Sequence, residues 1–191
     1  MAEVLLFHHA QGLTPGVIAF ADELRAAGHT VETPDLYDGN TMTELAAGIA
    51  YAQQVGFDTI GERGSVVAES MPKEIVYAGI SLGVMAAQEL AQNRDGARGA
   101  IFISGCFPPS EFGTEWPSGI PAQVHMMEQD EWVLEGDLDA ARQLADSTAD
   151  ADLFLYPGDR HLFIDNSTPD YDESAATLLK QRVLAYLDGL G

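Results

Sequence analysis

Short apolar runs alternate with amphipathic segments along the whole chain. The first run, residues 4–8, is unbroken and bulky, as is typical of a strand buried on both faces of a parallel sheet. Later runs predict strands at residues 29–33, 74–78, 99–104, 122–127 and 152–156. This alternation predicts an α/β fold, a three-layer αβα sandwich with about six mostly parallel strands.

Apolar residues at helical spacing fill the intervals between these strands. Thr14 and Pro15 are typical of an N-cap and a first helical turn, and Gly28 is typical of the end of that helix. Thr41 and Glu44 fit a capping box for a second helix. We expect further helices at residues 82–93, 136–147 and 172–187, and a broken helix at residues 57–71.

The charge of the chain narrows its possible partners. Nine basic residues stand against 30 acidic ones, which gives a net charge of −21 at pH 7. A field of this sign repels phosphate backbones and anionic lipids, so we expect neither nucleic acid nor a membrane as a partner. Solubility, or adaptation to salt, explains such acidity, and cation binding is the alternative. The acidic run at residues 146–152 lacks calcium-loop spacing, and no zinc motif occurs, so we predict no metal and no cofactor.

A single cysteine, Cys106, rules out an intrachain disulfide, and we expect it to be a small buried residue. The first residues lack the basic segment of a signal peptide, and no stretch approaches the ~20 apolar residues of a membrane span. These features predict a single cytoplasmic domain over residues 1–191, with homo-oligomerisation left open.

The sequence Gly79-Ile80-Ser81-Leu82-Gly83 matches the pattern G-x-S-x-G. A serine at a tight strand-to-helix turn projects into a site where a base can reach its hydroxyl. Glycines two positions away relieve the crowding of that turn, and the first amides of the next helix point at a developing oxyanion. An apolar strand precedes this motif and an alanine-rich helix follows it, so we identify Ser81 as a nucleophile.

A base for this serine must come from one of five histidines. In the chain order expected for this turn, the acid and the histidine follow the serine, and only His125 and His161 do so. His125 lies inside an apolar strand, where a structural role is expected. His161 follows the sixth strand in a turn-rich loop, and functional groups gather at such strand ends. We therefore select His161.

The orienting acid is expected after the fifth strand, where three acidic residues occur. We select Asp130, because a short carboxylate in a turn can be held rigidly against an imidazole. Glu128 and Glu131 remain alternatives.

The loop after the first strand is expected to supply the second oxyanion donor, in addition to the amide of Leu82. We select the amide of Leu13, because the neighbouring Gly12 allows close backbone approach. If the second strand lies outside the first, the first and third strands flank the switch point, and their loops meet at one crevice. His9 has two alternative roles here, to shape this loop by hydrogen bonding or to have a purely structural position. The candidate substrate-binding residues are Gln11, Gly12, Tyr37, Phe107, Trp116 and Trp132.

The serine turn, the later acid and histidine, the AQG turn at residues 10–12 and the PDLY segment at residues 34–37 together resemble the dienelactone hydrolase family. The resemblance covers most of the chain and implies an α/β-hydrolase with a serine or cysteine nucleophile. The resemblance implies that Ser81, Asp130 and His161 are at the positions of the family's catalytic triad. It also implies that Leu82 and Leu13 supply the backbone amides of the oxyanion hole.

Three positions depart from the pattern of that family. Ser81 stands where the best-known members have cysteine, and Gly12 where they have a glutamate that pairs with it. Asp165 stands where they have an arginine that holds a substrate carboxylate. These departures favour ester-like acyl transfer by a serine and argue against recognition of a dienelactone-type anion.

We therefore expect a serine hydrolase that cleaves a small-molecule ester, lactone or thioester. A catalytically silent domain of the same fold, which binds a small ligand or a partner, is the main alternative. A flavodoxin-like or nucleotide-binding fold ranks third, because the loop after the first strand has neither G-x-G-x-x-G nor a P-loop lysine.

Overall fold

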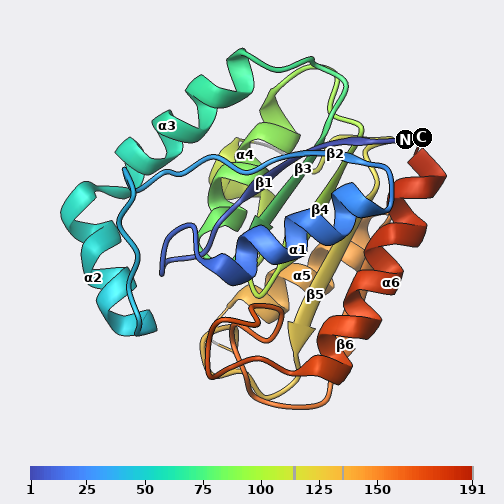
Figure 1. The fold of residues 1–191 in the computed structure, drawn as a ribbon. Helices are drawn as coiled ribbons and strands as arrows, with labels where there is room; N and C mark the ends of the chain where they lie inside the picture. The colour runs from blue at the N-terminus through green and yellow to red at the C-terminus, as the bar shows by residue number, and fades with distance from the viewer. Residues whose placement is uncertain (114, 135, 191) are drawn as a thin grey trace.

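The computed structural model describes residues 1–113, 115–134 and 136–190, and a six-stranded sheet lies at its centre (Figure 1). The strand order is β2-β1-β3-β4-β5-β6, and each pair of neighbours is parallel. The strands are β1 (Glu3–Phe7), β2 (Thr30–Glu32), β3 (Val76–Ile80), β4 (Gly99–Ile103), β5 (Ala122–Met127) and β6 (Ala151–Tyr156). The predicted fold class is confirmed.

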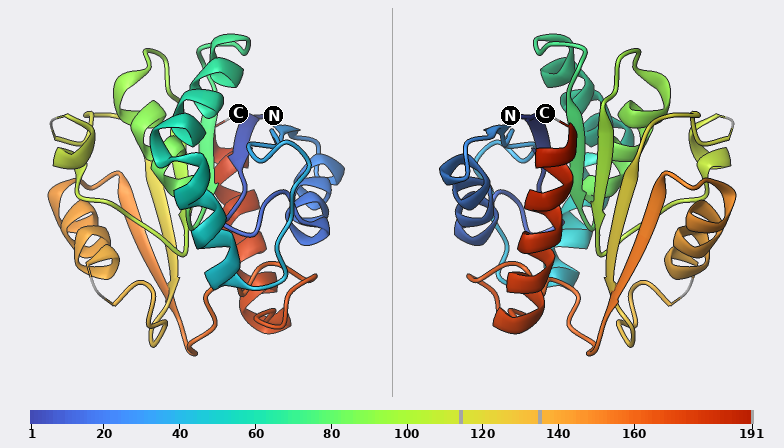
Figure 2. Two further views of the ribbon diagram at one scale, coloured as in Figure 1. Left: turned by 90° about the vertical axis from the view of Figure 1, so that its left-hand side faces the viewer. Right: turned by 90° about the vertical axis from the view of Figure 1, so that its right-hand side faces the viewer.

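Helices cover both faces of this sheet and so form the outer two layers (Figure 2). One face is covered by α1 (Pro15–Ala26) and α6 (Glu173–Leu190). The other is covered by α2 (Leu45–Val55), α3 (Phe57–Glu69), α4 (Gly83–Asn93) and α5 (Asp137–Ser147). Successive side chains of a strand point to opposite faces, so Leu5 and Leu6 enter different apolar clusters. A 3₁₀ turn, η1 (Pro109–Phe112), lies in the long loop after β4.

Two local predictions were wrong. The predicted capping box does not form, because α2 begins at Leu45 with Glu44 as an N-cap whose side chain makes no capping bond. The chain before it is instead fixed to the loop after β1, where the Met42 amide donates to the Gln11 carbonyl at 2.9 Å.

The helix expected to be broken, α3, is continuous from Phe57 to Glu69. Its Gly64 serves packing, since a Cβ there would lie 3.0 Å from the Phe7 ring and 3.3 Å from the Ala86 side chain. The interruption falls one residue before the helix, at Gly56, whose φ of 95° separates α2 from α3.

The topology gathers several loops at the carboxyl edge of the sheet. Because β1 lies between β2 and β3, the loops that follow β1 and β3 flank the switch point predicted from the sequence. The two termini lie side by side at the opposite edge (Figures 1 and 2). Within the residues described, no helix has both the length and the apolar character needed to cross a membrane.

Candidate active site

Ser81 occupies the sharp turn between β3 and α4. Its φ is 51°, in the left-handed region that non-glycine residues rarely adopt, and its amide donates to the Ile103 carbonyl at 2.7 Å. A Cβ at Gly79 would lie 2.4 Å from the Gly83 carbonyl oxygen, and one at Gly83 would lie 2.4 Å from the Phe7 carbonyl oxygen. Neither position has room for a side chain, which is the physical reason for the two glycines of the motif.

His161 reaches this serine from the loop between β6 and α6. Its Nε2 lies 2.7 Å from the Ser81 Oγ, and its ring is almost completely buried. Ser104, at the end of β4, donates from its hydroxyl to the His161 carbonyl at 2.6 Å and so fixes the backbone of that loop. The other histidine beyond the serine, His125, is buried and lies 2.8 Å from the Tyr156 hydroxyl, in the structural position expected for it.

Asp130 lies on the far side of the His161 ring. Its Oδ2 is 2.6 Å from Nδ1 of that ring, and its Oδ1 accepts the Trp132 amide at 3.0 Å, so the carboxylate has one fixed orientation. Asp130 is fully buried, whereas the alternatives Glu128 and Glu131 are exposed to solvent. The structure thus joins the three residues selected from the sequence in one hydrogen-bonded series of alcohol, imidazole and carboxylate. Such a series can make a serine hydroxyl nucleophilic.

A cavity of about 170 Å³ opens beside Ser81 and His161. This volume is below the range typical of sites for drug-sized ligands, so it suits a small group. The walls are mainly apolar and come from five loops and from the helices α2, α3 and α5. The lining residues are Ala10, Ile49, Ala52, Phe57, Ser81, Leu82, Ser104, Phe107, Trp132, Asp137 and His161.

The loop after β1 presents Ala10 to this cavity, not Leu13. Leu13 is not among the described residues that line the cavity, and its side chain packs against the apolar cluster under α1 and α6. The amides of Ala10 and Leu82 donate to no acceptor among the described residues. Both residues border the cavity that holds the Ser81 hydroxyl. The expectation for Leu13 is therefore corrected: Ala10 is the residue of this loop that reaches the site.

A second buried pair of histidine and aspartate explains the path of this loop. The Nε2 of His9 lies 2.7 Å from Oδ2 of Asp165, and both side chains are fully buried. The His9 Nδ1 accepts the Gln11 amide at 3.2 Å, and the Gly12 amide donates to the His9 carbonyl at 3.0 Å. The chain therefore turns tightly at residues 9–12, which places Ala10 at the cavity and carries Leu13 past it.

Asp165 accepts three further hydrogen bonds in this buried position. The Thr14 hydroxyl donates to it at 2.5 Å, and the amide and hydroxyl of Ser167 donate at 2.8 and 2.6 Å. Burial raises the pKa of this carboxyl, but the bonds from His9, Ser167 and Thr14 together outweigh burial and lower it to about 2. Asp165 therefore supports the loop after β1 and does not line the cavity.

The structure separates the candidate substrate-binding residues into two groups. Phe107 and Trp132 line the cavity, and the Trp132 ring centroid lies 6.0 Å from that of His161. The remaining four do not line it, and each has a structural position instead. These are Gln11 and Gly12 in the turn fixed by His9, Tyr37 packed edge-on against His8 and Tyr51, and Trp116 packed against Phe102.

Sequence reasoning missed Asp137, the one carboxylate among the described residues that line the cavity. It is the first residue of α5, and its Oδ2 accepts the Cys106 amide at 3.3 Å. Desolvation by burial raises the pKa of this carboxyl above its ordinary value. Its position directly after the loop of Asp130 was the only signal for it. The apolar lining residues Ile49, Ala52 and Phe57 were also missed, because only the packing of α2 and α3 brings them to the site.

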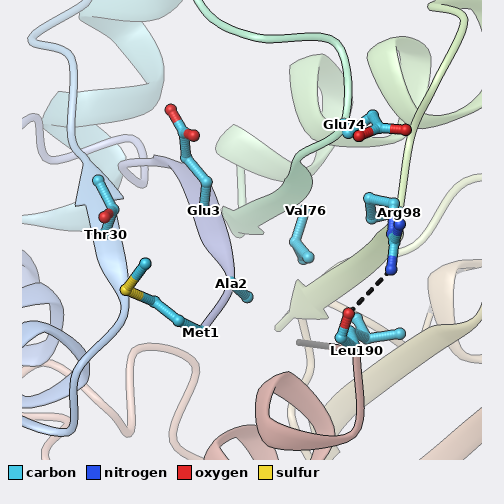
Figure 3. A pocket seen from close by; sticks show the side chains of 8 residues that line it. All are labelled: Met1, Ala2, Glu3, Thr30, Glu74, Val76, Arg98 and Leu190. Carbon is cyan, nitrogen blue, oxygen red and sulfur yellow. Dashed lines mark hydrogen bonds between the residues drawn. The ribbon is translucent and has the colours of Figure 1, made fainter.

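A second hollow, of about 280 Å³, opens at the opposite edge of the sheet near both termini (Figure 3). Glu3, Glu74 and Arg98 contribute charged groups to it, and Arg98 donates to the Leu190 carbonyl at 2.9 Å. Its described lining includes no cysteine, histidine or serine. The hydrogen-bonded serine, histidine and aspartate lie at the carboxyl edge, away from this hollow.

Throughout residues 1–113, 115–134 and 136–190, no group of three or more histidine, cysteine or acidic side chains is arranged to hold a metal ion. The site described above brings together a serine hydroxyl, an imidazole and a carboxylate beside the cavity.

Comparison with solved structures shows the same fold in proteins of low sequence identity. A dienelactone hydrolase from Anabaena variabilis is 19% identical, with a TM-score of 0.68 over 99% of this chain and 86% of that one. A dienelactone hydrolase-like promiscuous phosphotriesterase from metagenomic libraries is 16% identical, with a TM-score of 0.72 over 100% and 87%. A cold-adapted esterase from an Arctic intertidal metagenomic library is 18% identical, with a TM-score of 0.65 over 95% and 82%.

The comparison of sequences gives a more specific result. No curated protein shows significant similarity to this chain. The family model described as "Dienelactone hydrolase family", however, matches residues 1–190, which is nearly the full length. This match agrees with the resemblance noted in the serine turn and the PDLY segment, and the chain therefore belongs to the dienelactone hydrolase family.

Proposed function

We propose that this hydrolase cleaves a carboxylic ester, lactone or thioester through an acyl-serine intermediate. The observation that carries the proposal is the continuous series of hydrogen bonds from the Ser81 hydroxyl through His161 to Asp130, at the edge of a cavity. In this role the three residues are a catalytic triad.

In the first half of the reaction, Nε2 of His161 takes the Ser81 proton while Oγ attacks the acyl carbon. Asp130 stabilises the imidazolium that forms and holds the ring in position. The carbonyl oxygen gains negative charge, which the amides of Leu82 and Ala10 stabilise by hydrogen bonds. His161 then gives its proton to the leaving alcohol or thiol, and an acyl-serine remains.

In the second half, water replaces the leaving group. His161 takes a proton from that water as its oxygen attacks the acyl-serine, and the same two amides stabilise the second oxyanion. The proton returns to Ser81, and a carboxylic acid is released. The small-molecule substrate, the cytoplasmic location and the exclusion of nucleic acids and membranes stay predictions from the sequence.

An active-site fluorophosphonate probe and a set of short-chain thioesters test the proposal. The wild-type protein should form a covalent adduct at Ser81 and hydrolyse at least one thioester. Ser81→Ala should abolish labelling and lower kcat by several powers of ten without loss of fold, because only the attacking oxygen is removed. Failure of wild-type Ser81 to label, together with no hydrolysis, would support a catalytically silent domain.

A further inference from the structure

Among the described residues that line the cavity beside Ser81, one acidic side chain is not used by the proposed reaction. Ser81 and His161 take part in the chemistry, and the Ser104 hydroxyl is occupied by the His161 carbonyl. Asp137 remains. Its Oδ2 accepts a long hydrogen bond from Cys106, and its Oδ1 accepts none from another described residue. This carboxylate therefore retains the capacity to bind a group that enters the cavity.

The described lining of the cavity includes no arginine or lysine, so the Asp137 carboxylate has no permanently cationic partner there. The ring of His161 also lines the cavity, but its Nδ1 is already bonded to Asp130. The chain as a whole carries −21 at pH 7 and adds to the negative potential. A substrate carboxylate would therefore be repelled at the site, whereas an ammonium group would be attracted.

The apolar part of the wall suits the same kind of group. Three aromatic residues, Phe57, Phe107 and Trp132, line the cavity together with Asp137. The faces of aromatic rings attract cations, and they do so most strongly for a poorly hydrated ammonium group. A carboxylate and several rings around a cavity of about 170 Å³ are therefore complementary to a small organic cation.

We infer that Asp137 is a specificity-determining residue that selects small esters bearing an ammonium group over neutral and anionic ones. The inference rests on the proposed function, since it names the substrate class of the same site.

Two sets of esters of matched shape test this inference, because the charged group can lie on either side of the ester bond. The acyl-side set contains the methyl esters of β-alanine, butyrate and the succinate monoanion. The alcohol-side set contains the acetate esters of choline, 3,3-dimethylbutanol and 3-hydroxypropionate. In at least one set, wild-type kcat/KM should favour the cation over the neutral ester by about tenfold and disfavour the anion.

Asp137→Asn keeps an acceptor for the Cys106 amide but removes the charge, so it should reduce the preference for the cation to within about twofold of the neutral ester. The matched control is Asp139→Asn, which removes an exposed charge two residues further along the same helix. This control should retain the wild-type preference. Unchanged ratios in Asp137→Asn for both ester sets would overturn the inference, even if the neutral esters are hydrolysed well.

Binding to the inactive Ser81→Ala protein separates this inference from the proposed function. Titration calorimetry should show that choline binds more tightly than 3,3-dimethylbutanol, and that adding Asp137→Asn removes the difference. Equal binding of the two alcohols in Ser81→Ala would also overturn the inference. Preferential binding of choline by a protein that hydrolyses no ester would sustain it while the hydrolase proposal fails.

Discussion

Two buried pairs of histidine and aspartate lie at the carboxyl edge of this sheet. They differ mainly in the hydrogen-bond partner of the second nitrogen of each histidine ring. His161 and Asp130 lie 2.6 Å apart, and His9 and Asp165 lie 2.7 Å apart. The free nitrogen of His161 faces the Ser81 hydroxyl, whereas that of His9 accepts the Gln11 amide. The first pair can move a proton, while the second holds a loop.

The surroundings of the two carboxylates reinforce this difference. Asp130 accepts one backbone amide besides its histidine, whereas Asp165 accepts the Thr14 hydroxyl and two bonds from Ser167. A carboxylate with so many donors favours one rigid arrangement of the two segments that it joins, the loop between β1 and α1 and the loop between β6 and α6. The same two residue types therefore serve chemistry at one place and architecture at another, because their neighbours differ.

The largest effect should come from breaking the first pair. Asp130→Asn should lower kcat for ester hydrolysis by about 10⁴-fold, because the amide favours the wrong imidazole tautomer and cannot stabilise the imidazolium. Steady-state kinetics on a thioester measure this loss. Glu131→Gln, an exposed change one residue away, is the control and should stay within about twofold. A similar loss in both variants would contradict the assignment of Asp130.

Breaking the second pair should mainly affect stability. Asp165→Asn should lower the free energy of unfolding by about 3 kcal/mol, since it leaves His9 and several buried donors without their charged acceptor. Denaturant unfolding measures this change. Asp188→Asn removes an exposed partner of His29 and should cost less than about 1 kcal/mol. If Asp165→Asn lowered kcat as much as Asp130→Asn and left stability intact, the division of roles would be wrong.

The smallest effect concerns acid stability. The pKa of Asp165 is about 2 in the folded protein against 3.8 for the ordinary group, so its ionised form favours folding. This contribution, about 2 kcal/mol, is present above pH 4 and is lost as the pH falls towards 2. The difference in unfolding free energy between wild type and Asp165→Asn should therefore shrink by about that amount over this interval.

Two buried histidines also change the free energy of unfolding at low pH. Their contributions should cancel when wild type is compared with Asp165→Asn. Burial lowers the pKa of His8 to about 4 and that of His125 to about 3, so both become destabilising as the pH falls below 6.5. They are present in wild type and variant alike. A difference between the two proteins that stays constant from pH 6 to pH 2 would show that Asp165 is not the source of the acid effect.

Much of the site could be predicted because its chemistry coincides with local sequence signals. The serine turn needs glycines on both sides, and the contacts of Gly79 and Gly83 show why. His161 follows a strand end, where parallel sheets gather functional groups. The choice of Asp130 over Glu128 and Glu131 followed from the length of the side chain and its turn, and it agrees with burial in the structure.

The predictions from sequence were wrong where contacts between residues far apart in the sequence determine the path of the backbone. Leu13 was selected because Gly12 precedes it, yet the loop is fixed by Asp165, more than 150 residues away. The capping box at Thr41 failed for a similar reason, because the bond between Met42 and Gln11 overrides the local preference. No pattern within a short window contains such information.

By itself, the sequence determined the sheet and its helices, the serine turn and the residue types that converge on it, because these depend on apolar periodicity and on steric limits within a few residues. Only the tertiary structure decided that Ala10 and not Leu13 reaches the cavity, that Asp165 supports a loop, and that Asp137 lines the cavity. Those assignments depend on which side chains meet across the fold, and buried hydrogen bonds between distant segments set that geometry.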